Sequence, residues 1–555
     1  MLCRCPCSRR HQHPHLLLQR PLSRKGPALR LQRNARTHAP FPPHQSHGSM
    51  NTMQAPPSAS RPIVRLPGTQ AAEVFHSFSK GLCPQCRRLV DGQRIIRNGK
   101  VFLRKQCPEH GRSEALISGD ADWFLKSLAY IKPGSVPLKH STPVAKGCPS
   151  DCGLCADHEQ HSCLPIIEIT NYCNLECPIC IVQNRHNYNM TVPEFRSIIA
   201  GLVEKEGALD TINLSGGEPT VHPQFLELLD LAKRPEIARV SISTNGVLIA
   251  SDLAFCHELA RRGAYVNLQL DALSNPELRR LRGAGDQEGL KRRALENLRT
   301  AGVRTTIVST LARGVNDDRI GECVRLLLEN DFILSLMFQP AAYTGYGGAH
   351  FSPHNPLDVI TIPDVVRHCE EQTDGVLRRS DFHPLPCSHP SCFALTYLLK
   401  TDSGVVPFPR FIELERYLEA IANRGTLRPD ETLESSIRDT IDTLWSGSGQ
   451  VPDCDAILQT LRRLLKMMYP SDRCLELEER LAIGESLVKT IFIHAFMDEH
   501  TFEVDRIKKC CTHYALPDGR LMPGCAYNML YRHNDPRYTG PAGTTPVWGQ
   551  AVGAL

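Results

Sequence analysis

The stretch Asn171-Tyr-Cys-Asn-Leu-Glu-Cys-Pro-Ile-Cys180 follows an apolar run at 164–169 and carries three cysteines in a C-x3-C-x2-C spacing. Three thiolates this close in one loop, those of Cys173, Cys177 and Cys180, can hold three corners of a [4Fe–4S] cluster, which usually takes four cysteines. The fourth iron would then be open to a small molecule. The alternative is a zinc knuckle, but zinc sites are usually closed by a fourth Cys or His, and none follows at the usual spacing. The motif therefore favours an iron–sulfur cluster with one open coordination position.

The composition is that of a globular protein with two or three domains: 555 residues, 41% hydrophobic and 22% charged. No run approaches 18 uninterrupted apolar residues, so we expect no transmembrane span. The 23 cysteines cluster as CPQC, CPSDCGLC and CNLECPIC. These spacings are too tight for ordinary disulfide loops, and no secretory signal pattern precedes them. We therefore expect metal sites in a reducing, cytoplasmic compartment.

The net charge of +5 comes from one end of the chain, because no Asp or Glu occurs before Glu73. Residues 1–72 are rich in Arg, His, Pro and Gln, which predicts a disordered basic arm. Two readings of this arm stay open: a segment resembling an organellar transit peptide, or a mis-assigned start upstream of Met50 or Met53. Without the arm the chain is close to neutral, so no nucleic-acid partner is implied.

Residues 73–145 carry the pattern of a rubredoxin or zinc ribbon. Cys83-Pro-Gln-Cys86 is followed by an alternating stretch at 94–104 and by Cys107-Pro-Glu-His110. A knuckle, a hairpin and a second knuckle form this layout. Cys83, Cys86 and Cys107 are the candidate ligands, with His110 as the fourth, for one mononuclear iron or zinc. A structural role is the simpler expectation for this site.

Two further cysteine sets suggest auxiliary clusters. Cys148, Cys152, Cys155 and Cys163 lie within 146–163 and make a full set for a closed [4Fe–4S] cluster, with zinc as the alternative. We expect this site to lie near the first cluster. The C-terminal region, 376–534, offers a second set that only the fold could unite, in which either of two adjacent cysteines could be the ligand: Cys387, Cys392, Cys510 or Cys511, and Cys525.

From 164 to 375 the pattern alternates between strand and helix. Apolar runs at 164–169, 211–214, 240–243, 265–270, 305–310 and 333–338 predict buried parallel strands. The helix after Thr191-Val-Pro-Glu194 begins with a capping box and shows apolar residues on one face. This predicts an α/β fold, a partial (β/α)6 TIM-like barrel with its chemistry at the carboxyl ends of the strands. Helical patterns near 410–423, 431–445 and 456–468 predict a mostly helical C-terminal domain, in which core packing and an apolar groove for a lipid would look alike. The tail, 535–555, is expected to be flexible.

Glycine and polar residues follow four successive predicted strands. Singly each could be an ordinary turn, but their order after the strands favours one ligand site. The candidates are Gly216, Gly217 and Glu218, then Ser243 and Asn245, then Gln269 and Asp271, and finally Asn316. With the cysteine loop, this set resembles the radical SAM superfamily. The resemblance implies that the backbone at Ser215-Gly-Gly-Glu218, together with Glu218, holds the amino group of S-adenosylmethionine. It also implies that the remaining candidates face its ribose, carboxylate or adenine.

The ribbon, the box Gly147-Cys-Pro-Ser-Asp-Cys-Gly-Leu-Cys155 and the segment 517–528 (PDGRLMPGCAYN) resemble one group within that superfamily. It contains the archaeal tetraether lipid synthase and the proteins similar to 7,8-dihydro-6-hydroxymethylpterin methyltransferase. The resemblance implies two auxiliary [4Fe–4S] clusters beside the first, S-adenosylmethionine, and an electron donor of the ferredoxin or flavodoxin type. Reductive cleavage of S-adenosylmethionine would give a 5′-deoxyadenosyl radical that abstracts hydrogen from an unactivated carbon.

Three functions stay open at this point. The first is carbon–carbon coupling or another modification of lipid chains, with peripheral contact to a membrane as an option. The second is methylation of a pterin or another small molecule. The third is a non-catalytic metal-binding scaffold, against which the glycine motif and its barrel context argue.

Overall fold

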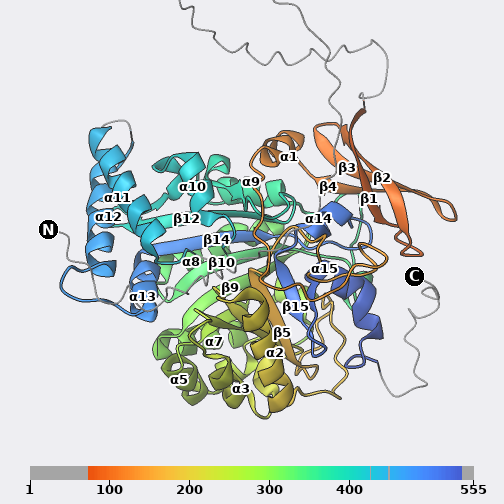
Figure 1. The fold of residues 1–555 in the computed structure, drawn as a ribbon, viewed down its shortest axis with the longest axis horizontal. Coiled ribbons are helices and arrows are strands. Elements are labelled where there is room, and N and C mark those ends of the chain that lie inside the picture. The colour runs from red at the N-terminus through yellow and green to blue at the C-terminus, as the bar shows by residue number, and fades with distance from the viewer. Residues whose placement is uncertain (1–72, 425–426, 448–450, 540–555) are drawn as a thin grey trace, which may run out of the picture. The chain divides into compact units, whose positions relative to one another are not determined.

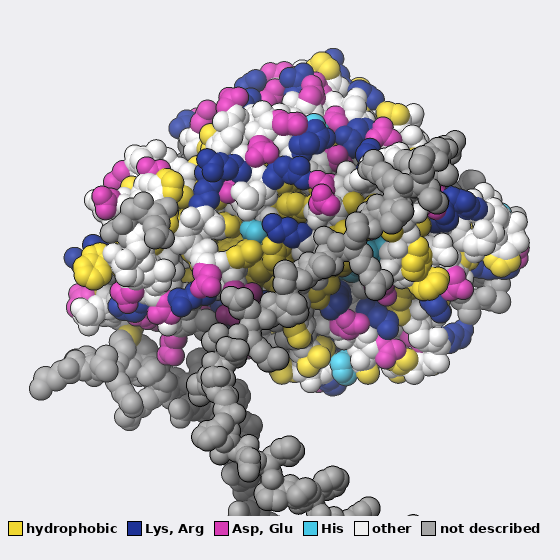
Figure 2. Space-filling view, turned by 90° about the horizontal axis from the view of Figure 1, so that it is seen from above, with side chains coloured by type: hydrophobic (Ala, Val, Ile, Leu, Met, Phe, Trp, Pro, Cys, Tyr) yellow, Lys and Arg dark blue, Asp and Glu magenta, His cyan; other side chains and the backbone are white. Residues whose placement is uncertain are grey.

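The computed structural model describes residues 73–424, 427–447 and 451–539 (Figure 1). The predictions for the basic arm at 1–72 and for the tail at 540–555 lie outside the described residues. Among the helices that are described, none is both long and apolar enough to span a bilayer. Acidic and basic side chains are interspersed over the face shown in Figure 2, with hydrophobic side chains between them near its centre.

Six parallel strands form the centre of the main sheet, as the sequence predicts. They are neighbours in chain order: β5 (Leu164–Thr170), β6 (Ile212–Gly216), β7 (Val240–Thr244), β8 (Tyr265–Gln269), β9 (Arg304–Leu311) and β10 (Ile333–Pro340). Their outer faces are apolar, and residues such as Ile167, Ile242 and Leu268 pack into one core with the helices. Their inner faces carry polar residues, among them Asn213, whose Oδ1 accepts from Ser241 Oγ and Asn267 Nδ2.

Helices cover the outer face of this sheet (Figure 1). They are α2 (Val192–Glu206), α3 (Phe225–Ala232), α4 (Val247–Ser251), α5 (Leu253–Arg261), α7 (Gln287–Ala301), α8 (Ile320–Glu329) and α9 (Ile362–Glu371). α6 (Asn275–Arg282) instead packs its Leu281 against Ile179 of the cysteine loop and Tyr343. The predicted capping box of α2 is present: Thr191 Oγ1 accepts from Glu194 N at 3.4 Å, and the Glu194 carboxylate accepts from Thr191 N at 2.7 Å. Phe195, Ile198 and Leu202 are buried on one face of this helix.

The C-terminal region extends the sheet at both edges. β14 (Val488–His494) lies parallel to β10, and β12 (Phe393–Thr401) pairs antiparallel with β14, followed outward by the short β11 (His383–Pro384). At the other edge β15 (Thr512–Ala515) runs parallel to β5 and pairs with β16 (Leu521–Pro523). β13 (Gly404–Pro407) pairs with β12. The sequence suggested only one short strand in this region, near 492–498, because edge pairing between distant segments leaves little local signal.

The rest of the C-terminal region is helical, as expected. It contains α10 (Leu414–Ile421), α11 (Glu431–Ser446), α12 (Cys454–Met468), α13 (Leu477–Leu487) and the short α14 (Val504–Lys508) and α15 (Gly524–Ala526). Helices α10 to α12 share a second core with the inner face of β12, which includes Tyr397, Leu461 and Leu464. The sequence did not predict α13.

The first residues of the expected flexible tail are instead packed in place. Arg537 and Tyr538 are 7% and 5% exposed, and the Tyr538 hydroxyl donates to Glu168 Oε2 at 2.9 Å. The buried Glu168 carboxylate on β5 also pairs with Arg532 at 2.8 Å. A buried charge needs such partners, which is why this part of the chain is ordered.

The ribbon forms a separate four-stranded antiparallel sheet in the order β1 (Val74–Leu82), β2 (Leu89–Arg97), β3 (Lys100–Cys107) and β4 (Gly111–Ser118). Helix α1 (Ala121–Leu128) follows it. The arrangement agrees with the predicted knuckle–hairpin–knuckle layout. Turns at 83–88 and 107–111 bring the two knuckles to one end of this sheet.

Replacing Leu268 with Ala should destabilise the barrel by about 2–5 kcal/mol, because the side chain is fully buried and leaves a cavity. The measurement is the shift of the unfolding transition in urea and on heating. Leu253→Ala on α5 is the control, since that side chain is 37% exposed. Equal effects of the two substitutions would contradict the placement of Leu268 in the core.

Candidate active site and metal centres

The cysteine loop follows β5 at the carboxyl end of the sheet. Cys173, Cys177 and Cys180 are half-buried, and Asn171 at the start of the loop is fully buried. Asn171 Nδ2 donates to Asn187 Oδ1 at 2.6 Å and to the carbonyl oxygen of Arg537 at 2.5 Å, which fixes where the loop leaves the strand. Burial raises the pKa of the Cys173 thiol to about 12. A thiol with this pKa is neutral near pH 7. A bound metal would displace its proton, because the form that ligates a metal is the thiolate.

The glycine pair after β6 lies directly against this loop. Gly217 N donates to Thr170 O at 2.9 Å, and Glu218 N donates to Tyr172 O at 2.7 Å. A Cβ on Gly216 would lie 2.1 Å from Thr170 O, and one on Gly217 would lie 2.2 Å from Tyr172 O. Gly216 also has φ +142°, a value that other residues rarely adopt. Only glycine allows the two loops this close together.

Glu218 is 1% exposed, and its carboxylate accepts four hydrogen bonds from the protein. The donors are Thr220 N at 3.2 Å, Thr220 Oγ1 at 2.6 Å, Thr244 Oγ1 at 2.7 Å and Asn245 N at 2.7 Å. Three of these donors bond to Oε1 and only Asn245 N bonds to Oε2, so Oε2 keeps an acceptor position. In the described structure Glu218 ties the loop after β6 to the loop after β7, and its expected contact with an amino group stays a prediction.

Asn245 and Ser243 lie near the cysteine loop and on the inside of the sheet, and their role as ligand residues stays a prediction. Asn245 Nδ2 lies 3.8 Å from Cys173 Sγ and donates to Asn174 Oδ1 at 2.7 Å, so the loop after β7 reaches the cysteine loop. Ser243 faces the inside of the sheet, where it donates to Asn213 Oδ1 at 3.1 Å. Both side chains remain half-buried, which leaves surface for a ligand.

Asp271 and Asn316 are fully buried, and both are satisfied by the protein. Arg282 holds Asp271 with two hydrogen bonds, at 2.7 and 2.8 Å, and Thr310 N donates to the same carboxylate at 2.8 Å. Asn316 Nδ2 donates to the carbonyl oxygens of Asp271 at 3.0 Å and Thr310 at 2.9 Å. These two predicted residues join the loops after β8 and β9. Arg282, which the sequence gave no reason to select, lies close enough to Cys177 and Cys180 to interact with their charges.

Lys291 on α7 is a second residue that the sequence analysis missed. It is 1% exposed, and its Nζ donates to Asn245 O at 2.6 Å and to Gln269 Oε1 at 2.8 Å. Its two hydrogen bonds, made from α7, thus fix the positions of two predicted ligand residues. A signal was available: Lys291, Ala294 and Leu298 share the buried face of α7, where a lysine is unusual.

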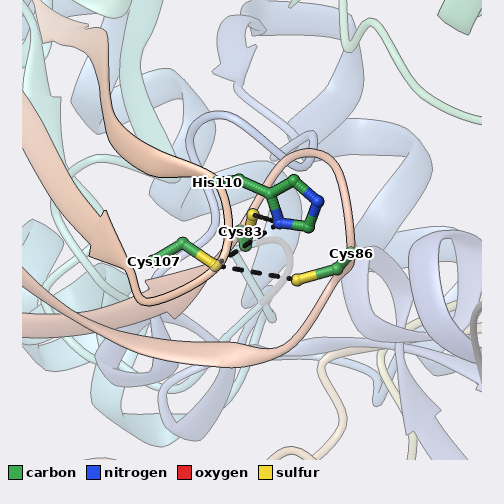
Figure 3. A group of neighbouring side chains, drawn as sticks. All are labelled: Cys83, Cys86, Cys107 and His110. Atoms are coloured by element: carbon green, nitrogen blue, oxygen red, sulfur yellow. Dashed lines mark hydrogen bonds between the residues drawn. The ribbon is translucent and has the colours of Figure 1, made fainter.

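The ribbon site brings all four predicted ligands together (Figure 3). The ligand atoms of Cys83, Cys86, Cys107 and His110 lie within 4.8 Å of one another. Cys86 Sγ is 3.9 Å from Cys107 Sγ, and His110 Nδ1 is 3.7 Å from Cys83 Sγ and 3.5 Å from Cys107 Sγ. Separations of this size fit one tetrahedral ion with Cys3His ligands.

Cys148, Cys152 and Cys155 form one group in the loop before β5. Burial raises the pKa of Cys148 to about 11 and that of Cys152 well above its ordinary value, and neighbouring thiols add to both effects. Tyr531 closes the loop, because its hydroxyl accepts from Cys152 N at 3.3 Å and donates to the carbonyl oxygens of Pro149 and Ser150 at 2.7 Å.

Cys163 lies with C-terminal cysteines, whereas the sequence analysis grouped it with Cys148, Cys152 and Cys155. The thiols of Cys387 and Cys511 are its neighbours and raise its pKa, and Cys163 N donates to Cys511 O at 2.9 Å. The reason is the pairing of β15 with β5, which places 511 beside 163. Asn423 N donates to Cys387 Sγ at 3.0 Å, a contact that suits a thiolate ligand.

Cys392, Cys510 and Cys525 form a third group of interacting thiols. Arg506 Nε donates to Cys392 Sγ at 3.3 Å, and Met497 N donates to Cys525 Sγ at 3.2 Å. The fold therefore divides the C-terminal set that the sequence suggested: Cys387 and Cys511 lie beside Cys163, whereas Cys392, Cys510 and Cys525 interact with one another. Cys511 also lies near Cys392 and Cys510, and auxiliary clusters at these cysteines stay a prediction. Cys256, Cys323 and Cys369 are buried in the barrel core.

Comparison with known proteins agrees with this geometry. Residues 167–327 match the radical SAM superfamily, and residues 75–119 match the "HMPTM N-terminal zinc ribbon domain". A curated relative, 7,8-dihydro-6-hydroxymethylpterin dimethyltransferase of Methanocaldococcus jannaschii, is 31% identical over 484 residues, 81% of this chain and 93% of that protein. The GTP 3′,8-cyclase of Chlorobaculum tepidum is 31% identical over 31% of this chain and 52% of its own length. The structure of Streptococcus suis SuiB bound to S-adenosylmethionine, at 20% identity, covers 39% of this chain and 47% of its own, with a TM-score of 0.32 too low to carry an argument.

The barrel and its cysteine loop define the class of protein as a radical SAM enzyme. Within that superfamily, the chain belongs to the family of the M. jannaschii dimethyltransferase, which shares its ribbon and nearly its whole length. This family carries a [4Fe–4S] cluster and uses S-adenosylmethionine.

Gly217→Ala should abolish binding of S-adenosylmethionine, because the added methyl group would push the loop after β6 away from the cysteine loop. The measurement is equilibrium dialysis of labelled S-adenosylmethionine against reconstituted protein. Gly201→Ala on α2 is the control, since its Cβ would meet only the flexible end of Lys205. Undiminished binding by Gly217→Ala would contradict the site.

Binding of S-adenosylmethionine should weaken as the pH rises through about 8. Burial lowers the pKa of Lys291 to about 8, so its ammonium group is present below that pH and lost above it. Loss of the charge weakens the hydrogen bonds to Asn245 and Gln269. Binding measured from pH 7 to 9 should show this for the wild type, whereas Lys291→Met should bind weakly at every pH and show a flat profile. A flat profile for the wild type would contradict this role.

Proposed function

We propose that this enzyme abstracts hydrogen from an unactivated carbon of a substrate with a long apolar chain, and that it couples or otherwise modifies lipid chains. The observation that carries this proposal is a cavity of 580 Å³ between the inner face of the sheet and helices α10 to α13. Ligand pockets usually measure about 300–1,000 Å³. Its walls are mainly apolar and aromatic, including Tyr397, Phe408, Leu433, Leu461 and Phe492.

The cavity lies toward the amino ends of the strands, where Thr211, Arg239 and Tyr265 line it. Ser241, Asn267 and Met337 line it, and each precedes by two residues a side chain on the same face of its strand. Those side chains are Ser243, Gln269 and Gln339. An apolar chain in the cavity would therefore have to extend past Ser241 and Asn267 along the inside of the barrel to reach the carboxyl ends of β7 and β8, where we place the nucleoside.

The residues of this chain have separable roles in the proposed reaction. Cys173, Cys177 and Cys180 would hold a [4Fe–4S] cluster, which supplies the electron that cleaves bound S-adenosylmethionine. Gly216 and Gly217 give the ligand access to the backbone, and Asn245 and Gln269, held by Lys291, would orient it. The aliphatic walls of the cavity would exclude water and hold the substrate carbon close to the nucleoside.

The cysteine groups fit the proposed auxiliary clusters. Their buried sulfurs accept hydrogen bonds from backbone and arginine N–H groups, the contacts that stabilise thiolate ligands. We propose that Cys163 serves the C-terminal site with Cys387 and Cys511, and that the electrons come from a donor of the ferredoxin or flavodoxin type. Cys163 and Cys511 also line the cavity, so a cluster held there would face the proposed substrate.

A second candidate is methylation of a pterin. The relative from M. jannaschii, which shares nearly its full length with this chain, carries that activity in its name. The polar residues inside the barrel, Asn213, Ser241 and Asn267, form hydrogen bonds with one another and could also bind a heterocycle.

One experiment separates the two candidates. Anaerobically reconstituted protein is given dithionite and S-adenosylmethionine, and 5′-deoxyadenosine is followed with a membrane lipid extract, with 7,8-dihydro-6-hydroxymethylpterin, and with neither. We expect stimulation by lipid and a coupled lipid product by mass spectrometry. A methylated pterin without lipid dependence would overturn the lipid proposal, and Cys177→Ala should remove all turnover.

A variant of the cavity sharpens the test. Leu433→Trp on α11 would fill the cavity and should lower lipid-dependent turnover while leaving the binding of S-adenosylmethionine unchanged. Arg438→Trp places the same side chain on the exposed face of the same helix and serves as the matched control.

A further inference from the structure

The two knuckles of the ribbon contact the turn at 498–500. Arg87, which directly follows the ligand Cys86, donates from Nη2 to Glu499 Oε1 at 2.8 Å. Lys105, two residues before the ligand Cys107, donates from Nζ to the carbonyl oxygens of Glu499 and His500, both at 2.8 Å. Glu499 and Lys105 are buried. The position of this turn therefore depends on how the knuckles are held.

Arg87 occupies this position at a conformational cost. Its φ is +55°, in the left-handed region that is unfavourable for a residue with a Cβ. Its backbone belongs to the knuckle, because Arg87 N donates to Cys83 O at 2.9 Å. A glycine would adopt this φ without strain. The contacts of the Arg87 side chain with Glu499 and with the carbonyl oxygen of Met529 offset the strain of an arginine at this position.

The same turn holds the segment that packs on the cysteine loop. Thr344 Oγ1 donates to Glu499 Oε1 at 3.0 Å, and Tyr343 N donates to Asp498 Oδ2 at 3.4 Å. Thr344 is 1% exposed, so no water replaces this contact. Oε1 of Glu499 is thus shared between the ribbon and the segment after β10.

Residues 345–348 then lie directly against the cysteine loop. Gly347 N and Gly348 N donate to Cys180 O at 2.7 and 3.1 Å, and Tyr346 N donates to Ile181 O at 3.2 Å. A Cβ on Gly345 would lie 2.2 Å from Ile181 O, and one on Gly347 would lie 2.5 Å from Pro178 O. This segment and the loop that carries Cys177 and Cys180 are therefore in close backbone contact, with no space for a side chain at Gly345 or Gly347.

We propose that the ribbon metal site is a positioning element for the cluster loop, acting through Arg87, Glu499, Thr344 and residues 345–348. Metal bound by Cys83, Cys86, Cys107 and His110 would fix both knuckles. Through the contacts described above, the fixed knuckles would hold residues 345–348 in place against the carbonyl oxygen of Cys180. Glu499 is then a positioning residue, since it touches neither the cluster nor the nucleoside. The inference depends on the assignment of the cluster to Cys173, Cys177 and Cys180 and not on the identity of the substrate.

The test compares Glu499→Ala, Glu499→Gln and Arg87→Met with the wild type, each reconstituted and assayed for metal and sulfide content. The readouts are the dissociation constant of S-adenosylmethionine and the change that it causes in the electron paramagnetic resonance spectrum of the reduced cluster. We expect Glu499→Ala and Arg87→Met to bind the nucleoside about 3- to 30-fold more weakly, with an altered spectrum and full metal content. Glu499→Gln should be close to the wild type, because its amide oxygen can still accept from Thr344.

Arg88→Ala is the matched control, because Arg88 is exposed, pairs with Glu109 and makes no hydrogen bond or ion pair to Glu499 among the described residues. Cys86→Ser, which should lose the ribbon metal, is expected to reproduce the defect of Glu499→Ala. If it does so while Glu499→Ala binds normally, the path through Glu499 is wrong. If Glu499→Ala and Cys86→Ser both bind normally, the ribbon has no positioning role. If the wild type itself fails to bind S-adenosylmethionine, the cluster assignment fails instead.

Discussion

The close approach of two backbone loops, after β5 and after β6, is the constraint on which the site depends. Gly216 and Gly217 lie against the carbonyl oxygens of Thr170 and Tyr172 at distances that exclude any side chain. This contact sets the position of the cysteine loop relative to the strand ends, where the candidate ligand residues gather. A shift of about 1 Å at such a place is enough to lose much of an enzyme's rate. The rigid sheet beneath supplies the precision that a loop alone would lack.

Several residues that the sequence motifs select serve as scaffolding for the loops. Glu218, Asp271 and Asn316 are buried and hydrogen-bonded within the protein, so they join the loops after β6, β7, β8 and β9 into one network. Lys291 and Arg282 complete this network from helices. Because each member is satisfied, the network is rigid, and an unpaired member would be costly in a buried site. We expect the ligand to contact the backbone and the half-buried amides of Asn245 and Gln269.

The C-terminal region completes the barrel. β14 and β12 continue the sheet past β10, while β15 extends it past β5, and helices α10 to α13 close a cavity against the inner face. The same pairing of β15 with β5 carries Cys511 to Cys163. The ribbon, through Arg87 and Lys105, contacts this region as well. The ribbon and the helices α10 to α13 therefore contact different parts of the C-terminal region, the ribbon at the turn 498–500 and the helices around the cavity.

The sequence by itself determined the cysteine loop, the six parallel strands, the capping box of α2 and the ribbon ligands, because each depends on residues close together in the chain. Spacing, period and capping are local properties that a reader of the sequence can follow. Only the tertiary structure decided that 488–494 joins the barrel, that Cys163 lies with Cys387 and Cys511, and that Lys291 supports Asn245. It also decided the anchoring of 535–539, which the polar composition of the tail concealed. These features arise from contacts between segments that are far apart in the chain, from 46 residues for Lys291 and Asn245 to 370 for Tyr538 and Glu168. Whether a charge or a strand edge is buried is decided only where such segments meet.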